Sequence, residues 1–445
     1  MSQPPQDKPT HPGRRAERGA SDARGDPQTA RWRGRWLLAA PHRLAFFCAG
    51  LMFAASALWW TCVLWSRLDG WPLRWQVSPV LAHSLLFTFG FMPLFFSGFL
   101  FTAGPKWLAQ PEMHASALLP TAGAALAGWA IFVPGVNLST PLAAIGLALV
   151  AAGWGIFTLR LWRLVRTSRA RDRTHPRWVA AACTIGALAM WAAAGGLAAQ
   201  REDIARAAVQ LGLWGFVALV FVTVAHRMIP FFGDGGLARL DLRWPGWLLW
   251  VFGATLALQA VFGIIDALAG PPGASARALR AALEAPSALL LVTLALRWVA
   301  VPRLRIPLRQ RLPRMMYIGF AWFALALVLA TVADALAAFG GDGVALGLAP
   351  LHAMTIGFFG SILLAMASRV ACGHSGRSQV ADAFLWSLFW LLQAAVVLRL
   401  ASAAQPALPP FVLMLAASAW ACVATAWALR YGRWFGRPRP DGRPG

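Results

Sequence analysis

The stretch LHAMTIGFFGSILLAMASRVACGHSGR, residues 351 to 377, is apolar over most of its length and carries a histidine near each end, His352 and His374. A helix of about 20 mostly apolar residues is long enough to cross the hydrocarbon core of a bilayer. The stretch therefore predicts a membrane-spanning helix. An imidazole inside such a helix is costly unless it has a partner, so His352 marks a candidate functional site.

The whole chain has the composition of an integral membrane protein. Of its 445 residues, 58% are hydrophobic and 13% are charged, whereas a soluble domain carries roughly 25% charged residues. The net charge of +23 comes from arginines that gather in a few loops and at the two ends of the chain. Basic clusters beside apolar segments orient a protein in a bilayer. We therefore expect lipid as a partner of this chain, and no nucleic acid.

Twelve segments are long and apolar enough to cross the bilayer. By residue number they are 44–65, 78–102, 115–134, 139–160, 178–198, 206–228, 246–268, 279–299, 315–338, 346–370, 380–401 and 409–430. This pattern predicts an all-α fold, a polytopic membrane helix bundle of about twelve transmembrane helices. Residues 41–432 form the predicted membrane domain, between a disordered basic tail at 1–40 and a second basic tail at 433–445.

The distribution of arginine predicts the orientation of the bundle, because cytoplasmic loops carry an excess of Lys and Arg. The loops after the fourth and eighth segments hold most of the internal arginines: Arg160, Arg163, Arg166, Arg169, Arg171, Arg173 and Arg177, then Arg297, Arg303, Arg305, Arg309, Arg311 and Arg314. If both loops lie inside, both termini are cytoplasmic.

Motifs of soluble enzymes are absent from the sequence. It has no nucleotide-binding loop, zinc-protease helix or serine-hydrolase elbow, so any chemistry takes place within the bundle, and whether the protein is an enzyme stays open. The five cysteines are scattered, and no CxxCH sequence is present. Any haem would therefore be bound non-covalently.

Two histidines share one depth in the predicted bundle. His83 lies about five residues into the second segment and His352 about six into the tenth, so both lie roughly 8–10 Å below the outer boundary. Imidazoles at one depth on different helices suit the axial positions of a haem. We interpret His83 and His352 as candidate haem ligands. The alternative is that each imidazole hydrogen-bonds a neighbouring carbonyl or one of the acids Asp266 and Asp334.

Neighbouring residues on the same two segments leave room for a ring. His83, Gly90 and Ser97 recur every seven residues and form a stripe of modest bulk. Phe359 lies seven residues after His352, where it could flank a macrocycle.

A second layer of histidines is expected on the inner side. His226 ends the sixth segment, and His374 follows the tenth, close to Cys372. Imidazole together with a thiolate is a copper-binding set, so His226 and His374 are candidate metal ligands. The alternative for His374 is a helix end capped by Gly373 and Gly376.

The other four histidines lie outside these candidate sites. His114 lies on the inner side, between the second and third segments. His11 and His42 lie in or beside the first tail, and His175 lies in a basic loop. We expect these last three to be solvated surface residues.

Three stretches resemble the NnrS family, in the order that the family has them. They are the opening stretch at 351–377, HRMIPFF at 226–232 and GFLFTAGPKW at 98–107. The first is long and specific. The second segment departs from the family's HxHE pattern, because this chain has Leu81-Ala82-His83-Ser84 there. His226 stands where many members have glycine.

The resemblance implies a twelve-span protein of the bacterial inner membrane that is associated with haem and copper and takes part in the response to nitric oxide and nitrosative stress. It suggests roles for His83, His352 and His374, which fall on the family's histidine positions. With both His83 and His352 on one iron, electron transfer to or from a respiratory partner, or sensing by ligand displacement, is favoured. With only one of them on the iron, a position on the iron stays open for nitric oxide.

Two other functions remain as alternatives. One is a twelve-span transporter of a metal, haem or small solute, although the two halves of the chain show no repeat. The other is support for the assembly or protection of a respiratory complex. A complete haem-copper oxidase or nitric oxide reductase centre is excluded, because the seventh segment has no histidine and the tenth has one.

Overall fold

The computed structural model describes residues 31–232, 244–300, 309–340 and 346–440. In this part of the chain, twelve helical segments are long and apolar enough to cross a membrane. They are Pro41–Leu68, Pro79–Trp107, Ala115–Leu138, Thr140–Thr167, Thr174–Ala198, Glu202–Met228, Gly246–Ala269, Ala274–Arg297, Arg311–Phe339, Ala349–His374, Ala383–Ala404 and Phe411–Phe435. The all-α polytopic bundle is confirmed.

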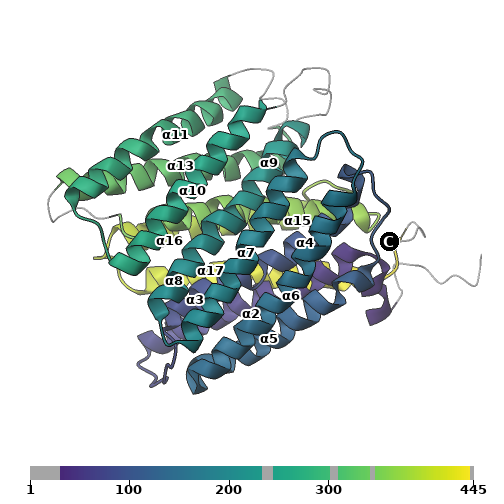
Figure 1. The fold of residues 1–445 in the computed structure, drawn as a ribbon, viewed down its shortest axis with the longest axis horizontal. Helices are drawn as coiled ribbons and strands as arrows, with labels where there is room; N and C mark the ends of the chain where they lie inside the picture. The colour runs from purple at the N-terminus through teal and green to yellow at the C-terminus, as the bar shows by residue number, and fades with distance from the viewer. Residues whose placement is uncertain (1–30, 233–243, 301–308, 341–345, 441–445) are drawn as a thin grey trace, which may run out of the picture.

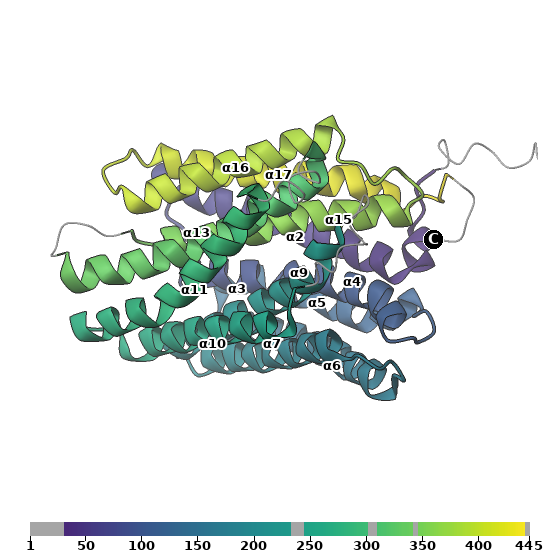
Figure 2. The same ribbon diagram turned by 90° about the horizontal axis from the view of Figure 1, so that it is seen from above.

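Nine of these spans are straightforward helices. They are α2 (Pro41–Leu68), α5 (Leu119–Leu138, preceded by the turn η2, Ala115–Leu118), α6 (Thr140–Thr167), α7 (Thr174–Ala198), α10 (Gly246–Ala269), α11 (Ala274–Ala300), α13 (Arg311–Phe339), α16 (Ala383–Ala404) and α17 (Phe411–Phe435). Figure 2 shows them side by side, with α16 and α17 along one side of the bundle and α6, α7 and α10 along the other.

Spans two, six and ten are each interrupted. Span two consists of α3 (Pro79–Phe89) and α4 (Met92–Trp107), span six of α8 (Glu202–Gln210), the π-helix η3 (Leu211–Ala218) and α9 (Leu219–Phe232), and span ten of α14 (Ala349–His352), the π-helix η7 (Ala353–Gly360) and α15 (Ser361–His374). Short π-helical turns occur frequently at functional sites. These three spans carry the histidines that the sequence analysis singled out.

The interrupted spans form the centre of the bundle. Burial inside the protein reaches 83%, 83% and 72% of the most apolar window in spans two, six and ten, against 33–56% in the other spans. Glycines allow the close approach. A Cβ on Gly212 of η3 would lie 2.3 Å from the Phe89 ring, and one on Gly357 of η7 would lie 2.7 Å from the Trp322 ring.

Both ends of the described chain lie at one end of the bundle, which we call the terminal end (Figure 1). The backbone N–H of Arg33 donates to the carbonyl of Gly436 at 2.8 Å, and Arg43 Nη1 donates to the carbonyl of Arg437 at 2.7 Å. The basic loops after α6 and α11 follow spans that end there, although Arg303 and Arg305 lie outside the described residues. We call the opposite end the cavity end.

Two local predictions differ from the structure. Residues 1–40 were expected to form a disordered tail, and residues 1–30 lie outside the described part of the chain. Within residues 31–40, Gly34–Ala39 form a helical turn, η1. This segment is held because Trp32 Nε1 donates to the carbonyl of Gly432 at 3.2 Å. The third span also continues past Pro134 to Leu138, and Ser139 alone separates it from α6.

Candidate functional site

A cavity of about 820 Å³ opens at the cavity end of the bundle. Its walls come from α2, α3, span six, α10, α11, α13, the first part of span ten, α16 and α17. This volume lies in the range of roughly 300–1,000 Å³ that is typical of small-molecule and cofactor sites. His83 and His352 both line it, so the structure brings the two histidines of the outer layer to one cavity.

His83 is held by aromatic rings. Its imidazole stacks on Trp60, with 4.1 Å between the ring centroids and 20° between the ring planes, and the Phe87 ring lies at 4.2 Å. Its Nδ1 is buried and has no hydrogen-bond partner in the described part of the chain. Since most buried polar atoms have a partner, an uncommitted nitrogen here is consistent with a ligand in the cavity.

His352 is oriented by the backbone of its own helix. Its Nδ1 lies 2.9 Å from the carbonyl oxygen of Leu348. A carbonyl oxygen only accepts, so Nδ1 carries the proton and the neutral ring keeps a lone pair on Nε2. A bond of this kind fixes the tautomer and orientation of metal-binding histidines. The expected carbonyl partner is therefore present, and it leaves Nε2 available.

The acids that were considered as histidine partners bind arginines instead. Arg280 donates to both carboxylate oxygens of Asp266, at 2.8 and 2.6 Å. Arg277 Nη1 donates to Asp334 at 3.1 Å. All four side chains line the cavity and form a charged wall on α10, α11 and α13. Charged residues within apolar segments were the signal that could have revealed this wall.

The expected stripe of His83, Gly90 and Ser97 is wrong as a continuous face. Span two breaks at Gly90, between α3 and α4, and the buried Ser97 hydroxyl donates to the carbonyl of Leu94. Of the three, His83 alone is a lining residue. Phe359 does line the cavity, where its ring stacks on Phe221 with 4.8 Å between the centroids.

Arg399 of α16 adds a cation that the sequence analysis missed. It lines the cavity, and its Nη1 donates to the Ser402 hydroxyl at 3.3 Å. The described residues place no carboxylate in an ion pair with it. Arg67 of α2 lines the same cavity. A cation in a membrane span is costly without a counter-charge, so the cavity favours an anionic group on its ligand.

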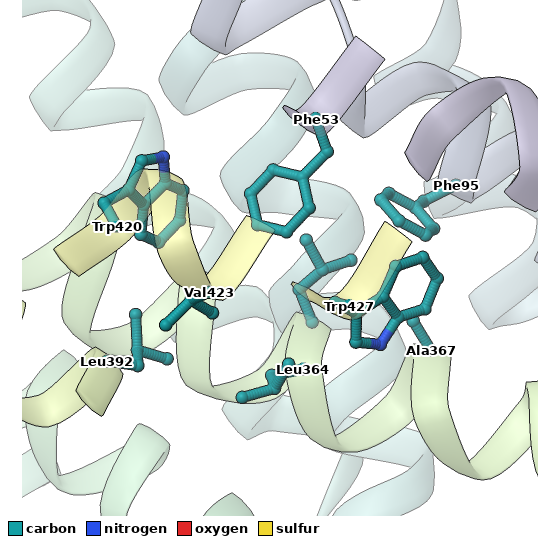
Figure 3. A pocket seen from close by; sticks show the side chains of 10 residues that line it. Phe53, Phe95, Leu364, Ala367, Leu392, Trp420, Val423 and Trp427 are labelled. Atoms are coloured by element: carbon teal, nitrogen blue, oxygen red, sulfur yellow. The ribbon is translucent and has the colours of Figure 1, made fainter. Parts of the chain in front are cut away.

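A small apolar pocket adjoins the cavity. Figure 3 shows that Trp420, Phe53, Phe95 and Trp427 surround it, together with aliphatic side chains of α15, α16 and α17. Its volume of about 10 Å³ is at the lower limit for a single water molecule. Trp420 lines both spaces, so this ring separates the pocket from the cavity.

At the terminal end, His374 lies against His42. Their ring centroids are 4.5 Å apart, and the planes are tilted by 40°. The expectation that His42 is solvated is wrong, because it is 1% exposed and its Nδ1 is buried without a partner in the described residues. It lies on the second residue of α2, which places it inside the bundle. The imidazole beside His374 is therefore His42.

The GHSGR sequence is also a helix cap, as the alternative interpretation held. Gly376 has a φ of +70°, and its N–H donates to the carbonyl of Gly373 at 3.4 Å. The N–H of Arg377 donates to the carbonyl of Cys372 at 3.0 Å. These bonds form a Schellman motif that ends α15 directly after His374.

His226 forms a second pair at the terminal end, with His175. His226 Nε2 lies 3.2 Å from the carbonyl of Pro245, and its Nδ1 lies 3.0 Å from His175 Nε2. Because the carbonyl accepts, His226 Nδ1 is the acceptor for His175. The nitrogen left over is His175 Nδ1, which is buried without a partner among the described residues. His175 thus lies in the first turn of α7, half-buried and paired with His226, and is not a fully solvated loop residue.

The remaining histidines do not join these pairs. His114 is exposed, and His11 lies outside the described residues. Within residues 31–232, 244–300, 309–340 and 346–440, no group of three or more His, Cys, Asp or Glu side chains could hold a metal ion. The pair of His83 and His352 and the pair of His42 and His374 each have two candidate ligands, whereas the pair of His175 and His226 leaves only His175 Nδ1 without a partner in the described part of the chain.

Comparison with known proteins identifies the family. The chain has no match among the curated proteins or among the solved structures. The family model described as NnrS protein matches residues 36–439, which include all twelve spans, the cavity and the three histidine pairs. The chain is therefore a member of the NnrS protein family and a multi-pass membrane protein.

Proposed function

We propose that the cavity binds haem b non-covalently, and that His83 and His352 would be the residues that hold its iron. The protein would then act in the response to nitric oxide and nitrosative stress, in the bacterial inner membrane. One observation carries the proposal: two imidazoles from different spans line a single cavity, and each keeps a nitrogen free for a ligand. This is the ligand set that a non-covalent haem in a helix bundle uses.

The other lining residues fit the same group. Trp60, Phe87, Phe359 and Trp420 offer aromatic surface to a flat macrocycle. Arg399 and Arg67 offer positive charge to the carboxylates of its propionate groups. A cavity that is lined by both aromatic rings and cations favours an amphipathic ligand of this kind.

A bound haem would supply an iron that binds nitric oxide or exchanges electrons. The residues of the chain set the conditions for that chemistry. Trp60 and Phe87 hold the plane of the His83 ring, and the carbonyl of Leu348 keeps the His352 proton on Nδ1.

For copper we propose a separate position at the terminal end, between His42 and His374. The contact of the two rings supports it, as does the free Nδ1 of His42. Imidazole suits copper. Cys372 is the weaker candidate of the original set, because it packs within the apolar core.

Haem binding is tested with purified full-length protein that is free of haem. Titration with haem b should produce a Soret band, and the His83→Ala plus His352→Ala variant should produce none. His114→Ala, at an exposed histidine, is the matched control and should titrate like the unaltered protein. The proposal fails if the unaltered protein gives no band or if the double variant gives the same band. Uptake of haem into proteoliposomes without a Soret band would favour a transporter instead.

The role in the nitric oxide response is tested in a deletion strain. The unaltered gene should restore growth under nitric oxide, and the double histidine variant, once shown to reach the membrane, should not. Growth restored by the haem-free variant would overturn the haem-based role and favour support of a partner respiratory complex.

A further inference from the structure

A ladder of polar side chains runs between α10 and α11 from the cavity into the membrane. Its three rungs are Asp266–Arg280, Gln259–Glu284 and Thr255–Ser287. Gln259 Nε2 donates to Glu284 Oε1 at 2.8 Å, and the Thr255 hydroxyl donates to that of Ser287 at 2.8 Å. From Asp266 to Thr255 the ladder covers about 16 Å along α10.

The ladder is a continuous feature of one helix interface. On each helix its residues are three, four or seven positions apart, which puts them on one face. The hairpin of α5 and α6 packs differently, since Gly128 and Gly146 bring those two backbones into direct contact. Packing through small residues is common between membrane helices, whereas ionisable residues there are rare and mark functional sites.

Glu284 is the rung without a balancing charge. It is 3% exposed and lines the cavity, and its Oε2 is buried with no hydrogen-bond partner in the described residues. Arg280, one turn earlier, gives both terminal nitrogens to Asp266. Arg277 donates to Asp334 and to the carbonyl of Pro272. The cations that face Glu284 are thus engaged by other acids.

A carboxylate with a buried, unpartnered oxygen is costly, and a proton removes the charge. Gln259 donates to Oε1, so Oε1 is the carbonyl oxygen and Oε2 is the place for the proton. The charged groups around it are Asp266 on α10, Arg277 and Arg280 on α11, and Asp334 on α13. Each of these four groups is paired with another of them, so none is left to balance a charge on Glu284.

We infer that Glu284 is a proton-carrying carboxyl group of the cavity. In each transfer the Oε2–H bond breaks and the proton passes to a water or ligand in the cavity. The carboxylate that remains takes a proton back from water that enters the cavity, while Asp266 and Arg280 stay ionised in their pair. No electrons move in this step. The inference deepens the proposed function and rests on it, because electron or nitric oxide chemistry at haem changes the charge in the same cavity.

Infrared spectroscopy of the haem-free full-length protein tests this without any haem activity. At neutral pH the unaltered protein should show the carbonyl band of a protonated carboxyl group, and the band should shift when H₂O is replaced by D₂O. Glu284→Gln should remove the band. Glu112→Gln makes the same change at an exposed acid and should leave it unaltered. The inference is overturned if the unaltered protein has no such band or if the band survives in Glu284→Gln.

A second variant covers the case in which Glu284→Gln does not fold. Gln259→Met keeps the volume of that side chain but removes the hydrogen bond to Oε1, so the band should move to higher frequency. An unmoved band would assign the proton to another group. A normal Soret titration together with a missing carboxyl band would overturn this inference and leave the haem proposal intact. A carboxyl band without a Soret band would overturn the haem proposal and leave the protonated Glu284 in place.

Discussion

The two ends of span ten place their histidines in opposite surroundings. At the cavity end, His352 and His83 line a space of about 820 Å³ with aromatic and charged walls. At the terminal end, His374 and His42 are in ring contact at 4.5 Å beside a capped helix end. The first arrangement adjoins a cavity of cofactor size, whereas the second is a direct contact between two rings. The cavity next to a histidine pair, more than the pair itself, is what separates the haem proposal from the copper proposal.

The largest expected effect separates the two ends of this one helix. His352→Ala should weaken haem binding by more than a hundredfold, because loss of residues that only support a metal ligand already costs about 10–100-fold. His374→Ala should leave haem affinity unchanged. Titration of both variants with haem b, followed by absorbance, measures the difference. Equal losses in the two variants would contradict two separate sites.

Copper should show the converse pattern. His42→Ala and His374→Ala should each lower Cu(I) affinity at least tenfold, since each removes one of two ligands. Cys372→Ser is the control, and it should bind like the unaltered protein. Competition with a Cu(I) chelator under anaerobic conditions gives the affinities. A loss of Cu(I) affinity confined to Cys372→Ser would show that the Cys372 thiolate, and not His42, binds the ion.

A smaller effect is expected from the cation of the cavity end. Arg399→Gln should weaken haem binding about tenfold, because a hydrogen bond to a charged group contributes about 1.5–3 kcal/mol and about 1.4 kcal/mol is a factor of ten. Ser402→Ala removes a partner of Arg399 but keeps its charge, and it should change little. An unchanged affinity in Arg399→Gln would exclude a contact with the propionates.

The smallest effect concerns the ion pair of Asp382 and Arg430 at the terminal end. Its hydrogen bond from Arg430 lowers the pKa of the Asp382 carboxyl. The pair thus stabilises the folded protein above the unfolded pKa of about 3.9, and this stability is lost as pH falls through the lower, folded pKa.

Asp382→Asn should therefore reduce the free energy of unfolding at pH 7 by less than about 1 kcal/mol and should remove this part of the acid sensitivity. Asparagine also caps helices, so the cap of α16 is preserved. Unfolding of detergent-solubilised protein at pH 7 and pH 3 measures both quantities. Haem affinity should be unaffected. A destabilisation that is equal at both pH values would rule out the ion pair as its cause.

Part of the candidate site was predictable and part was not. Counting residues along the two spans places His83 and His352 at the same depth in the bundle. This shared depth predicted that they lie close together, and both line the same cavity. The rotation of each helix about its axis does not follow from counting, and interruptions change it. That is why Gly90 and Ser97 fall outside the cavity, and why Asp266 faces Arg280 and not an imidazole.

By itself, the sequence determined the twelve spans, the position of His83, His226 and His352 within them, and the family, because length, hydrophobicity and motif order are properties of the chain read locally. The tertiary structure alone decided the partners: His42 for His374, His175 for His226, and Gln259 for Glu284. These partners come from spans far apart in the chain or from faces set by helix rotation. Both depend on how the interrupted central spans pack against the others, and hydrophobicity does not encode that packing.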